Sequence, residues 1–518
     1  MIKILKYSIL IKFTLSVILF NCCIFPVFSQ SSVLNKKLSV KSKNHSLYTV
    51  LNTISSQIGY EFSYNADLIL ANRNVKIDAD SSELHQILDI LLNDTSLTYN
   101  IIDKQIVIHK KNSLSKISTI SQNQTQQSII HIRGKILDKE TFSRLPFANI
   151  SINGKSLGTI SNEEGEFSFK IPVTLIDENI VFSYIGYKNS VFPLKDLTLS
   201  NNIIYLEKDF LSIQEVIIRS NNPELLIKNA MEKIKDNYYT QPFLMTSFYR
   251  EFVIKNKQYM SVMESVLSVY KSPYGGYYSD QIKMIKSRKN LNYSESDTFL
   301  LKLKGGLYAS LYLDIIKNPT NFLLEEYFNS YSYVLSDIVK YDNSTAYVIE
   351  FKPKYFLEDK SFCGRLYIDT ENLAIKYADF YIGSDAIEKL AQELVLKKSM
   401  KTKVKPESVH YWVSFRQIKG NHFLNLVRGE LEFKVKKRNQ IFSTSFKTTF
   451  EFAVNDIDTV NVDRFKRNET IETNTIFIDK NFEYDYSFWG DYNYISPDET
   501  LEEALIRISK KLQQLESE

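Results

Sequence analysis

The sequence predicts a multi-domain, β-rich protein: a small α+β domain with a duplicated βαβ unit, a β-sandwich, and a β-rich α+β domain that ends in a helix. Three observations lead to this prediction. An apolar pattern occurs twice near the start of the chain, at an offset of 37 residues. Short alternating segments separated by turn residues follow it. The 518 residues include 33 Tyr and 33 Phe but only 15 Gly, which favours long strands, and the length exceeds what one core accommodates.

Residues 1–29 have the composition of a cleaved signal peptide. An apolar stretch from Phe13 to Phe20 follows a basic start, and residues 27–29 end in a small residue. The basic residues are Lys3, Lys6 and Lys12. The alternative is a membrane anchor, but the stretch is shorter than the roughly 20 apolar residues of a spanning helix. We therefore expect an exported protein.

Charge and cysteine usage limit the function further. Without the three leader lysines the formal net charge falls from +4 to +1, so no basic footprint for nucleic acid remains. A lipoprotein signal would use Cys22 or Cys23, although Asn21 stands where such signals have a small residue. Cys363 is then the only other cysteine, so neither an internal disulfide nor a cysteine metal cluster is expected. Its strand-like surroundings favour a buried, inert thiol.

The first folded unit is expected at residues 35–110. Each copy of the repeat changes from strand periodicity to helix periodicity and back. Nine apolar positions recur: Leu38, Val40, Leu47, Val50, Leu51, Ile54, Tyr60, Phe62 and Tyr64 match Val75, Ile77, Leu84, Ile87, Leu88, Leu91, Leu97, Tyr99 and Ile101. Asp80, with Glu83 three residues later, predicts a capping box for the second helix.

This unit resembles the secretin and TonB short N-terminal domain, usually called STN. The resemblance rests on the doubled motif, on Gly59-Tyr60 after the first helix and on Leu97-Thr98-Tyr99 after the second. It implies a periplasmic domain of the kind found at the front of outer-membrane receptors or secretion channels, where it contacts another protein. The alternative is an unrelated α+β module with the same duplication.

Residues 111–128 are polar and predict a linker, and residues 129–210 predict a β-sandwich of about seven short strands. This second unit resembles the carboxypeptidase regulatory-like domain, a transthyretin-type sandwich without peptidase residues. The matching segments are Gly134 to Asp138, Pro146 to Ile150, Gly165 to Phe167 and Ser183 to Tyr187. Residues 214–218 resemble the segment that leads into the plug of TonB-dependent receptors. Only about 300 residues remain, too few for a plug and a 22-stranded barrel.

Residues 222–518 predict a β-rich domain of unknown family. A helix is expected after Asn222-Pro223, hairpins at 342–343, 369–372 and 419–421, and successive strands at 408–418, 423–434 and 442–454. A helix is expected near 385–399, and a tail helix at 499–516 carries an apolar stripe that must cover something. The arrangement resembles, by analogy only, the half-open barrels of periplasmic lipoprotein carriers. Whether it is a soluble sheet or membrane-embedded stays open.

Motifs for chemistry are scarce. The six histidines fit no zinc-peptidase spacing: His45, His85, His109, His131, His410 and His422. Residues 154–158 match G-x-S-x-G, but a strand rather than a helix is expected after Ser156, so we expect no nucleophile elbow there.

Two surface features are weaker candidates. An aromatic loop at Gly275-Gly276, with Tyr270, Tyr274, Tyr277 and Tyr278, is an ordinary turn or a recognition loop. A basic run is a solvated face or a contact for anionic lipid, and it consists of Lys283, Lys286, Arg288 and Lys289.

The sequence therefore predicts a non-enzymatic accessory protein of the cell envelope that docks an outer-membrane transport or signalling partner. We expect no catalytic, cofactor-binding or metal-binding residue, and the sequence assigns no partner-binding residue. Strand addition to a sheet edge would need no special side chains. The alternatives are a periplasmic carrier of a lipid or other apolar ligand in the third domain and, less favoured, a hydrolase. We expect no nucleic-acid partner, and no transmembrane helix after signal removal.

Overall fold

The computed structural model describes residues 33–64, 74–92, 97–102, 105–110, 129–209, 222–291 except 277, 306–355 except 343, 361–383, 386–387, 402–437, 442–472, 489–498 and 501. The chain separates into two compact units, residues 1–125 and 126–518, and each is described by itself. The predicted signal peptide, the linker 111–128, segment 214–218, and nearly all of the helices near 385–399 and 499–516 lie outside the described residues. Within the described residues, no helix is long and apolar enough to cross a membrane.

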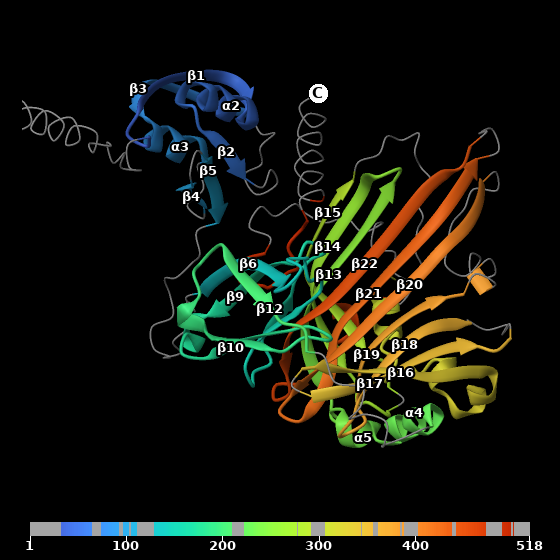
Figure 1. The fold of residues 1–518 in the computed structure, drawn as a ribbon. Helices are drawn as coiled ribbons and strands as arrows, with labels where there is room; N and C mark the ends of the chain where they lie inside the picture. The colour runs from blue at the N-terminus through green and yellow to red at the C-terminus, as the bar shows by residue number, and fades with distance from the viewer. Residues whose placement is uncertain are drawn as a thin grey trace, which may run out of the picture. The chain divides into compact units, whose positions relative to one another are not determined.

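The first unit contains the predicted strand–helix–strand order twice (Figure 1). The first copy is β1 (Lys37–Ser46), α2 (Leu47–Ile58) and β2 (Glu61–Tyr64). The second is β3 (Asn74–Glu83), α3 (Leu84–Leu92) and β4 (Leu97–Ile102), and β5 (Gln105–Lys110) follows. β1 pairs antiparallel with β3, while β5 lies between a parallel β2 and an antiparallel β4. Both helices bury their repeated apolar stripes in one core.

The ends of α2 show how the sequence sets this helix. The Ser46 side chain accepts a hydrogen bond from the Thr49 backbone N–H, and Gly59 ends the helix with a φ of 74°. The predicted capping box of the second helix is wrong. Asp80 and Glu83 lie in β3, and α3 begins at Leu84. Because β3 pairs with β1, Asp80 instead accepts a hydrogen bond from the Ser39 hydroxyl, 2.7 Å away.

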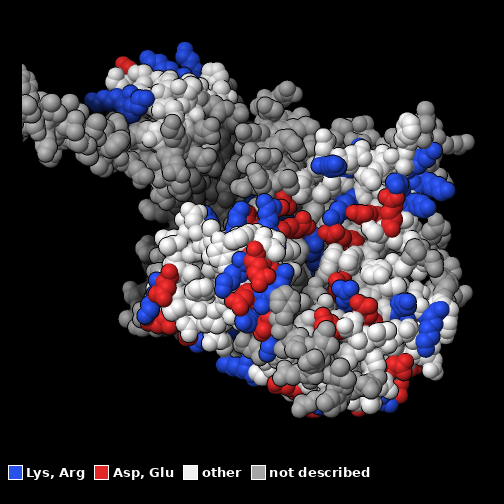
Figure 2. All heavy atoms as spheres, viewed as in Figure 1, with Lys and Arg blue, Asp and Glu red and all other residues white. Residues whose placement is uncertain are grey.

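The second unit begins with a sandwich of seven strands in two sheets. One sheet has the order β11 (Ser190–Pro193), β10 (Asn179–Ser183), β7 (Asn149–Ile152) and β8 (Gly158–Ile160). The other has the order β12 (Asn202–Leu206), β6 (Ile129–Asp138) and β9 (Glu166–Pro172). Phe167 and Phe182 meet edge to face between the sheets, with ring centroids 5.4 Å apart. Acidic and basic side chains interleave on the outside, as in the pairs Lys135–Glu166 and Lys139–Glu207 (Figure 2).

A ten-stranded antiparallel sheet follows in the same unit. Its order is β15 (Gln281–Leu291), β14 (Gln258–Lys271), β13 (Phe243–Lys255), β22 (Thr444–Asp458), β21 (Asn421–Lys437), β20 (Thr402–Ile418), β19 (Ile375–Ile382), β18 (Phe362–Asp369), β17 (Ser344–Pro353) and β16 (Tyr331–Tyr341). The β-rich prediction is confirmed, and turns join the strands at all three predicted hairpins. β22 enters between β13 and β21, which makes the two halves of the sheet continuous.

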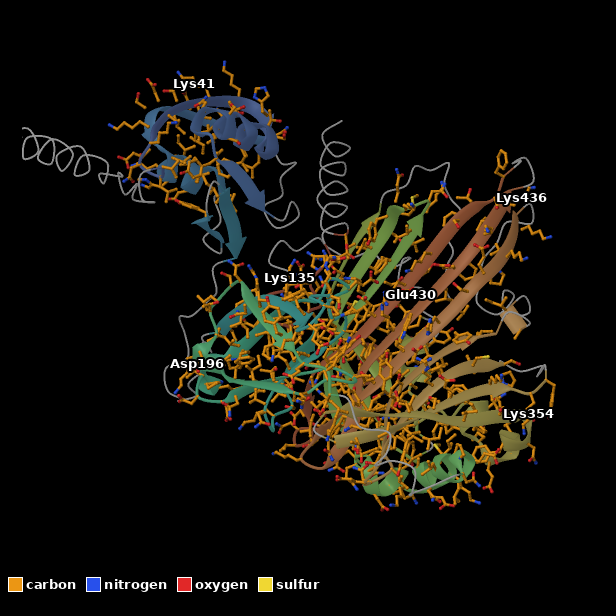
Figure 3. All side chains as sticks on the ribbon, in the orientation of Figure 1. Lys41, Lys135, Asp196, Lys354, Glu430 and Lys436 are labelled. Atoms are coloured by element: carbon orange, nitrogen blue, oxygen red, sulfur yellow. The ribbon has the colours of Figure 1, made fainter. Side chains whose placement is uncertain are left out.

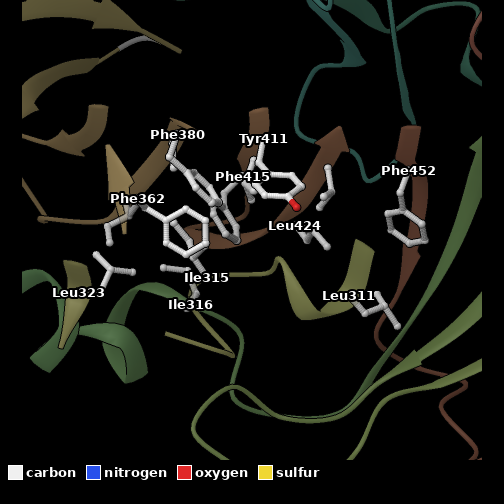
Figure 4. Close-up of a cluster of buried hydrophobic side chains, with 14 of the residues drawn as sticks. Leu311, Ile315, Ile316, Leu323, Phe362, Phe380, Tyr411, Phe415, Leu424 and Phe452 are labelled. Carbon is white, nitrogen blue, oxygen red and sulfur yellow. The ribbon is translucent and has the colours of Figure 1, made fainter. Parts of the chain in front are cut away.

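One face of this sheet is covered by helices, and we call it the helix-covered face. Apolar side chains from α4 (Pro223–Glu232), α6 (Gly306–Tyr312) and the 3-10 helices η6 (Asn321–Leu323) and η7 (Glu325–Ser330) join its core. Figure 4 shows part of this cluster, in which Leu311, Ile315, Ile316 and Leu323 belong with the sheet residues Phe380, Tyr411 and Phe452. The short α5 (Ile234–Asn237) lies next to α4.

The opposite face is the sandwich-covered face, because the β-sandwich packs on it. Ile160 of β8 joins Phe248 and Leu426 of the sheet in a small core. Ile185 packs on Ala346, Val348 and Tyr367. The backbone N–H of Gly186 also donates to the Lys340 carbonyl of β16, 2.7 Å away. The sandwich therefore rests on both halves of the sheet.

Residues 489–498 fasten the sandwich to the sheet, and we call them the C-terminal strap. Trp489 stacks on Tyr494 at 4.3 Å and contacts Phe248 of β13. The Asn493 side-chain oxygen accepts a hydrogen bond from the Lys170 N–H at 2.7 Å, and its side-chain nitrogen donates to the Lys170 carbonyl at 3.0 Å. The Asn493 side chain therefore bonds the Lys170 backbone as a neighbouring strand would. Leu501, in the predicted tail helix, is buried against Phe252, Tyr259 and Val262. Leu501 is the one described residue of the predicted tail stripe, and it covers part of the sheet.

A candidate binding groove on the sandwich-covered face

One row of side chains crosses all ten strands on the sandwich-covered face. Each member lies directly opposite the next in the strand register. Eight of the ten are Arg, Glu or Asp, and these eight alternate in sign. From β15 to β16 the row reads Arg288, Glu264, Arg250, Glu451, Arg428, Trp412, Asp379, Arg365, Glu350 and Val334. Opposite charges placed directly across strands attract, so the row supports this register.

The half of the row on β14, β13, β22 and β21 is buried beneath the sandwich and the strap. Arg250 donates to Glu264 at 2.9 Å and lies 3.5 Å from Glu451, and its guanidinium also donates to the Ile495 carbonyl of the strap. Arg428 pairs with Glu163 of the sandwich. Burial opposes ionisation of Glu264, but the charges of Arg250 and Arg288 outweigh it and lower its pKa. This half of the row is structural.

The half on β16 to β20 lines an open groove of about 310 Å³. Alternate residues of five strands form two adjacent rows in it. The first row is Val334, Glu350, Arg365 and Asp379, and the second is Ser332, Lys352, Cys363, Tyr381 and His410. The side chains of Arg365 and Glu350 are about half exposed, whereas Arg250 of the same row is 3% exposed. Here the sheet presents charges of both signs to solvent.

One ion pair and one hydrogen-bonded pair organise the groove. Arg365 Nε donates to Glu350 at 3.0 Å, and His410 Nε2 lies within hydrogen-bond reach of Asp379. The His410 ring stacks on Trp412 with centroids 4.0 Å apart and meets Tyr381 edge to face at 5.7 Å. Tyr381 stays 46% exposed and Val334 54% exposed. Fixed charges beside exposed apolar groups suit binding of a segment that carries both kinds of side chain.

Among the described residues of the groove, Cys363 and His410 do not form a nucleophile–base pair. Cys363 is half-buried rather than buried as expected. Tyr381 of β19 separates it from His410 of β20, so the thiol and the imidazole are two strand spacings, about 10 Å, apart. Histidine activates a thiol only within hydrogen-bond reach. The His410–Asp379 pair therefore orients a ring and does not activate Cys363.

Ser156 lies at the joint between the sandwich and the sheet. Strand β8 follows it, as the sequence predicts, and its hydroxyl donates to Asp456 of β22. Its carbonyl accepts from Arg416, 2.6 Å away. Burial lowers the pKa of Arg416 to about 10. Gly158 leaves room for this guanidinium, because a Cβ there would overlap it. Ser156 thus helps to attach the sandwich to the sheet.

The other residues singled out in the sequence have structural contacts. His131 bonds Ser168 at 2.7 Å, and His85 lies 3.3 Å from Glu83. Tyr274 of the aromatic loop is buried and donates to Asp314, while Tyr278 is 68% exposed, and Tyr277 lies outside the described residues. In the basic run on β15, Lys283 pairs with Glu469 and Arg288 with Glu264.

The sequence interpretation missed the groove, and one signal for it was present. Glu350, Arg365, Asp379 and His410 each lie next to apolar residues of their strands, but only the register shows that they meet. Among the described residues, no group of three His, Cys, Asp or Glu side chains could hold a metal ion.

Comparison with known proteins identifies part of the chain. Residues 132–218 match the model of the CarboxypepD_reg-like domain, which agrees with the resemblance noted for the sandwich. No curated protein matches the chain. The STN resemblance stays an expectation from the sequence.

Three solved structures illustrate the structural likenesses. A DUF1329 family protein from Desulfovibrio piger is 11% identical, with 47% of this chain and 96% of that chain covered and a TM-score of 0.20. The FpvAI–pyocin S2 complex is 10% identical, covering 84% and 61%, with a TM-score of 0.13. FpvA of P. aeruginosa bound to heterologous pyoverdines is 11% identical, covering 78% and 58%, with a TM-score of 0.13. This chain thus spans about 60% of those receptor chains. At such TM-scores these likenesses carry no argument.

Proposed function

We propose that the protein is a non-enzymatic interaction protein of the cell envelope, and that the groove and the neighbouring strand β16 bind an extended segment of a protein partner. The observation that carries this proposal is the position of the groove at the edge of the sheet. Both of its rows end on β16, which pairs only with β17 among the described strands. An added strand would place its own side chains next to Ser332 and Val334 and so extend both rows.

Strand β16 has the features of an edge that accepts a partner in a controlled way. A register shift between Leu335 and Asp337 interrupts the pairing with β17, and the carbonyl of Lys340 is already bonded to the sandwich. Bulges and charges protect edges from unspecific pairing. The segment from Tyr331 to Leu335 pairs regularly and borders the groove. Binding is therefore confined to a short segment, and the groove side chains supply its specificity.

The proposal can be tested by site-specific photo-crosslinking in the full-length chain. A photoreactive amino acid at Val334 should give one discrete product in envelope extracts, whereas Val460, which is 85% exposed, serves as the control position. Tyr381→Ala should lower the yield about tenfold, since an interfacial tyrosine contributes about 1.4 kcal/mol or more. Tyr312→Ala, at an exposed tyrosine on α6, should not. Equal products from Val334 and Val460, or a product insensitive to Tyr381→Ala, would contradict the proposal.

The carrier alternative requires space on the helix-covered face. There Leu311, Ile315 and Leu323 are buried against the sheet, so the chain's own side chains occupy the position of an apolar ligand (Figure 4). A bound lipid would have to displace α6 and the segment that follows it. We therefore keep the partner-binding function as the proposal.

A further inference from the structure

Lysines gather where the long strands β20 and β21 end, away from the groove and the strap. Five of them are exposed and define what we call the lysine tip: Lys257, Lys403, Lys405, Lys434 and Lys436. Figure 2 shows blue side chains at this end of the sheet, and Figure 3 labels Lys436 there. The five lysines belong to three elements: the β13–β14 turn, β20 and β21. The turn is linked to β21 through β22, because the Asn256 N–H donates to the carbonyl of Ser445, and Ser445 lies opposite Lys434.

The register at the tip places like charges directly opposite each other. Lys403 lies across from Lys436, and Lys405 across from Lys434. Such pairs destabilise a sheet. Two carboxylates stand among the five lysines, Glu407 bonded to Lys434 and Glu432 next to Ser408. The formal net charge of the whole chain is only +4, so this basic tip is a local concentration of charge.

An exposed aromatic residue accompanies the lysines. Phe442 lies between β21 and β22, two residues before Thr444, and is 82% exposed. On the helix-covered face behind the lysines, Phe433, Val435 and Phe446 are buried, so the tip rests on a packed support. Clustered lysines attract anionic headgroups, and a neighbouring aromatic ring inserts at the headgroup level.

We propose that the lysine tip binds a membrane surface rich in anionic, phosphate-bearing lipid headgroups, with Phe442 entering the interface. This inference is independent of the partner proposed for the groove. The attraction of several lysines to an anionic surface offsets the repulsion within the pair Lys403–Lys436. The contact is peripheral, so salt weakens it.

Co-sedimentation of the full-length chain with lipid vesicles tests the proposal. We expect binding to vesicles that contain 30% phosphatidylglycerol, little binding to pure phosphatidylcholine vesicles, and release by 0.5 M NaCl. The double variant Lys403→Glu/Lys436→Glu should bind at least about tenfold more weakly, since each lysine near the surface contributes roughly a factor of five. This variant exchanges one like-charge pair for another, so its melting temperature should match that of the wild type. Phe442→Ser should weaken binding severalfold at constant salt.

Two controls separate this function from general charge effects. Lys195→Glu/Lys233→Glu changes the net charge equally at exposed lysines elsewhere and should leave binding unchanged. Lys403→Glu alone creates an opposite-charge pair with Lys436, so it should raise the melting temperature while it weakens vesicle binding. Equal binding to neutral and anionic vesicles, equal losses in the control variant, or salt-dependent binding to short DNA without binding to vesicles would overturn the proposal.

Discussion

A single carboxylate organises one end of the β-sandwich. Asp138 ends β6 and is buried, and it accepts hydrogen bonds from the Tyr187 hydroxyl at 2.6 Å and from two backbone N–H groups of its turn at 2.8 Å. The bond from Tyr187, then that from Thr141, lowers the pKa of Asp138. Asp138 and Tyr187 belong to two of the segments that carry the carboxypeptidase regulatory-like resemblance. The structure thus gives these motif residues a physical role.

Replacing Asp138 should destabilise the second unit. Asp138→Ala removes three acceptor contacts and leaves the Tyr187 hydroxyl buried without its partner, so we expect a loss of about 2–3 kcal/mol. Urea unfolding followed by tryptophan fluorescence measures this loss. Asp196→Ala, at an exposed carboxylate in the same sandwich, should change stability by less than about 0.5 kcal/mol. Equal effects of the two substitutions would contradict the role of Asp138.

His131 should make stability depend on pH. Burial, and then the charges of Arg133 and Lys170, lower its pKa from 6.5 to about 4. Between those values the unfolded chain binds a proton that the folded chain does not, so the free energy of unfolding should fall as the pH drops from about 6.5 to 4. His131→Gln should show a shallower decrease in this window by urea titration at several pH values. Identical pH profiles would rule out this contribution.

At the level of elements, the row of charges allows the stability effect of a buried arginine to be compared with that of an exposed one. Arg250→Met leaves Glu264 and Glu451 with fewer partners in a dry environment and should cost about 3–5 kcal/mol. Arg365→Met removes the matching residue from the solvated end of the row and should cost less than about 1 kcal/mol. Thermal unfolding of the two variants under the same conditions checks this contrast. A similar loss of stability in both variants would show that burial does not determine what these arginines contribute.

The sequence predicted the elements well because their periodicity is local. The alternation along residues 408–418 and 423–434 anticipated β20 and β21, and the turn residues at 419–421 anticipated their hairpin. The row of charges could not be predicted in this way. Arg250 and Glu451 are about 200 residues apart, and only the insertion of β22 beside β13 brings them together. The capping box at Asp80 failed for the same reason, because pairing with a distant strand overrode a local signal.

At the scale of the whole molecule, the C-terminal strap couples the sandwich to the sheet. Trp489→Ala should remove the stack on Tyr494 and the contact with Phe248, and so loosen the joint. We expect residues 126–518 of the full-length chain to melt in one calorimetric transition in the wild type and in two in Trp489→Ala. Phe142→Ala, at a 64% exposed aromatic residue of the sandwich, is the control and should keep one transition. A single transition in Trp489→Ala would mean that the other joint contacts suffice.

The position of β22 in the sheet affects how the protein folds during its synthesis. Strands β13 to β15 leave the ribosome long before β22, yet β22 fills the gap between β13 and β21. Until it arrives, the inner border of β13 has no neighbour, and the half-sheets on either side of the gap cannot merge. The nascent polypeptide must therefore stay open through most of translation. A chaperone that holds it extended until β22 has been synthesised would suit this sequence better than early, piecewise compaction.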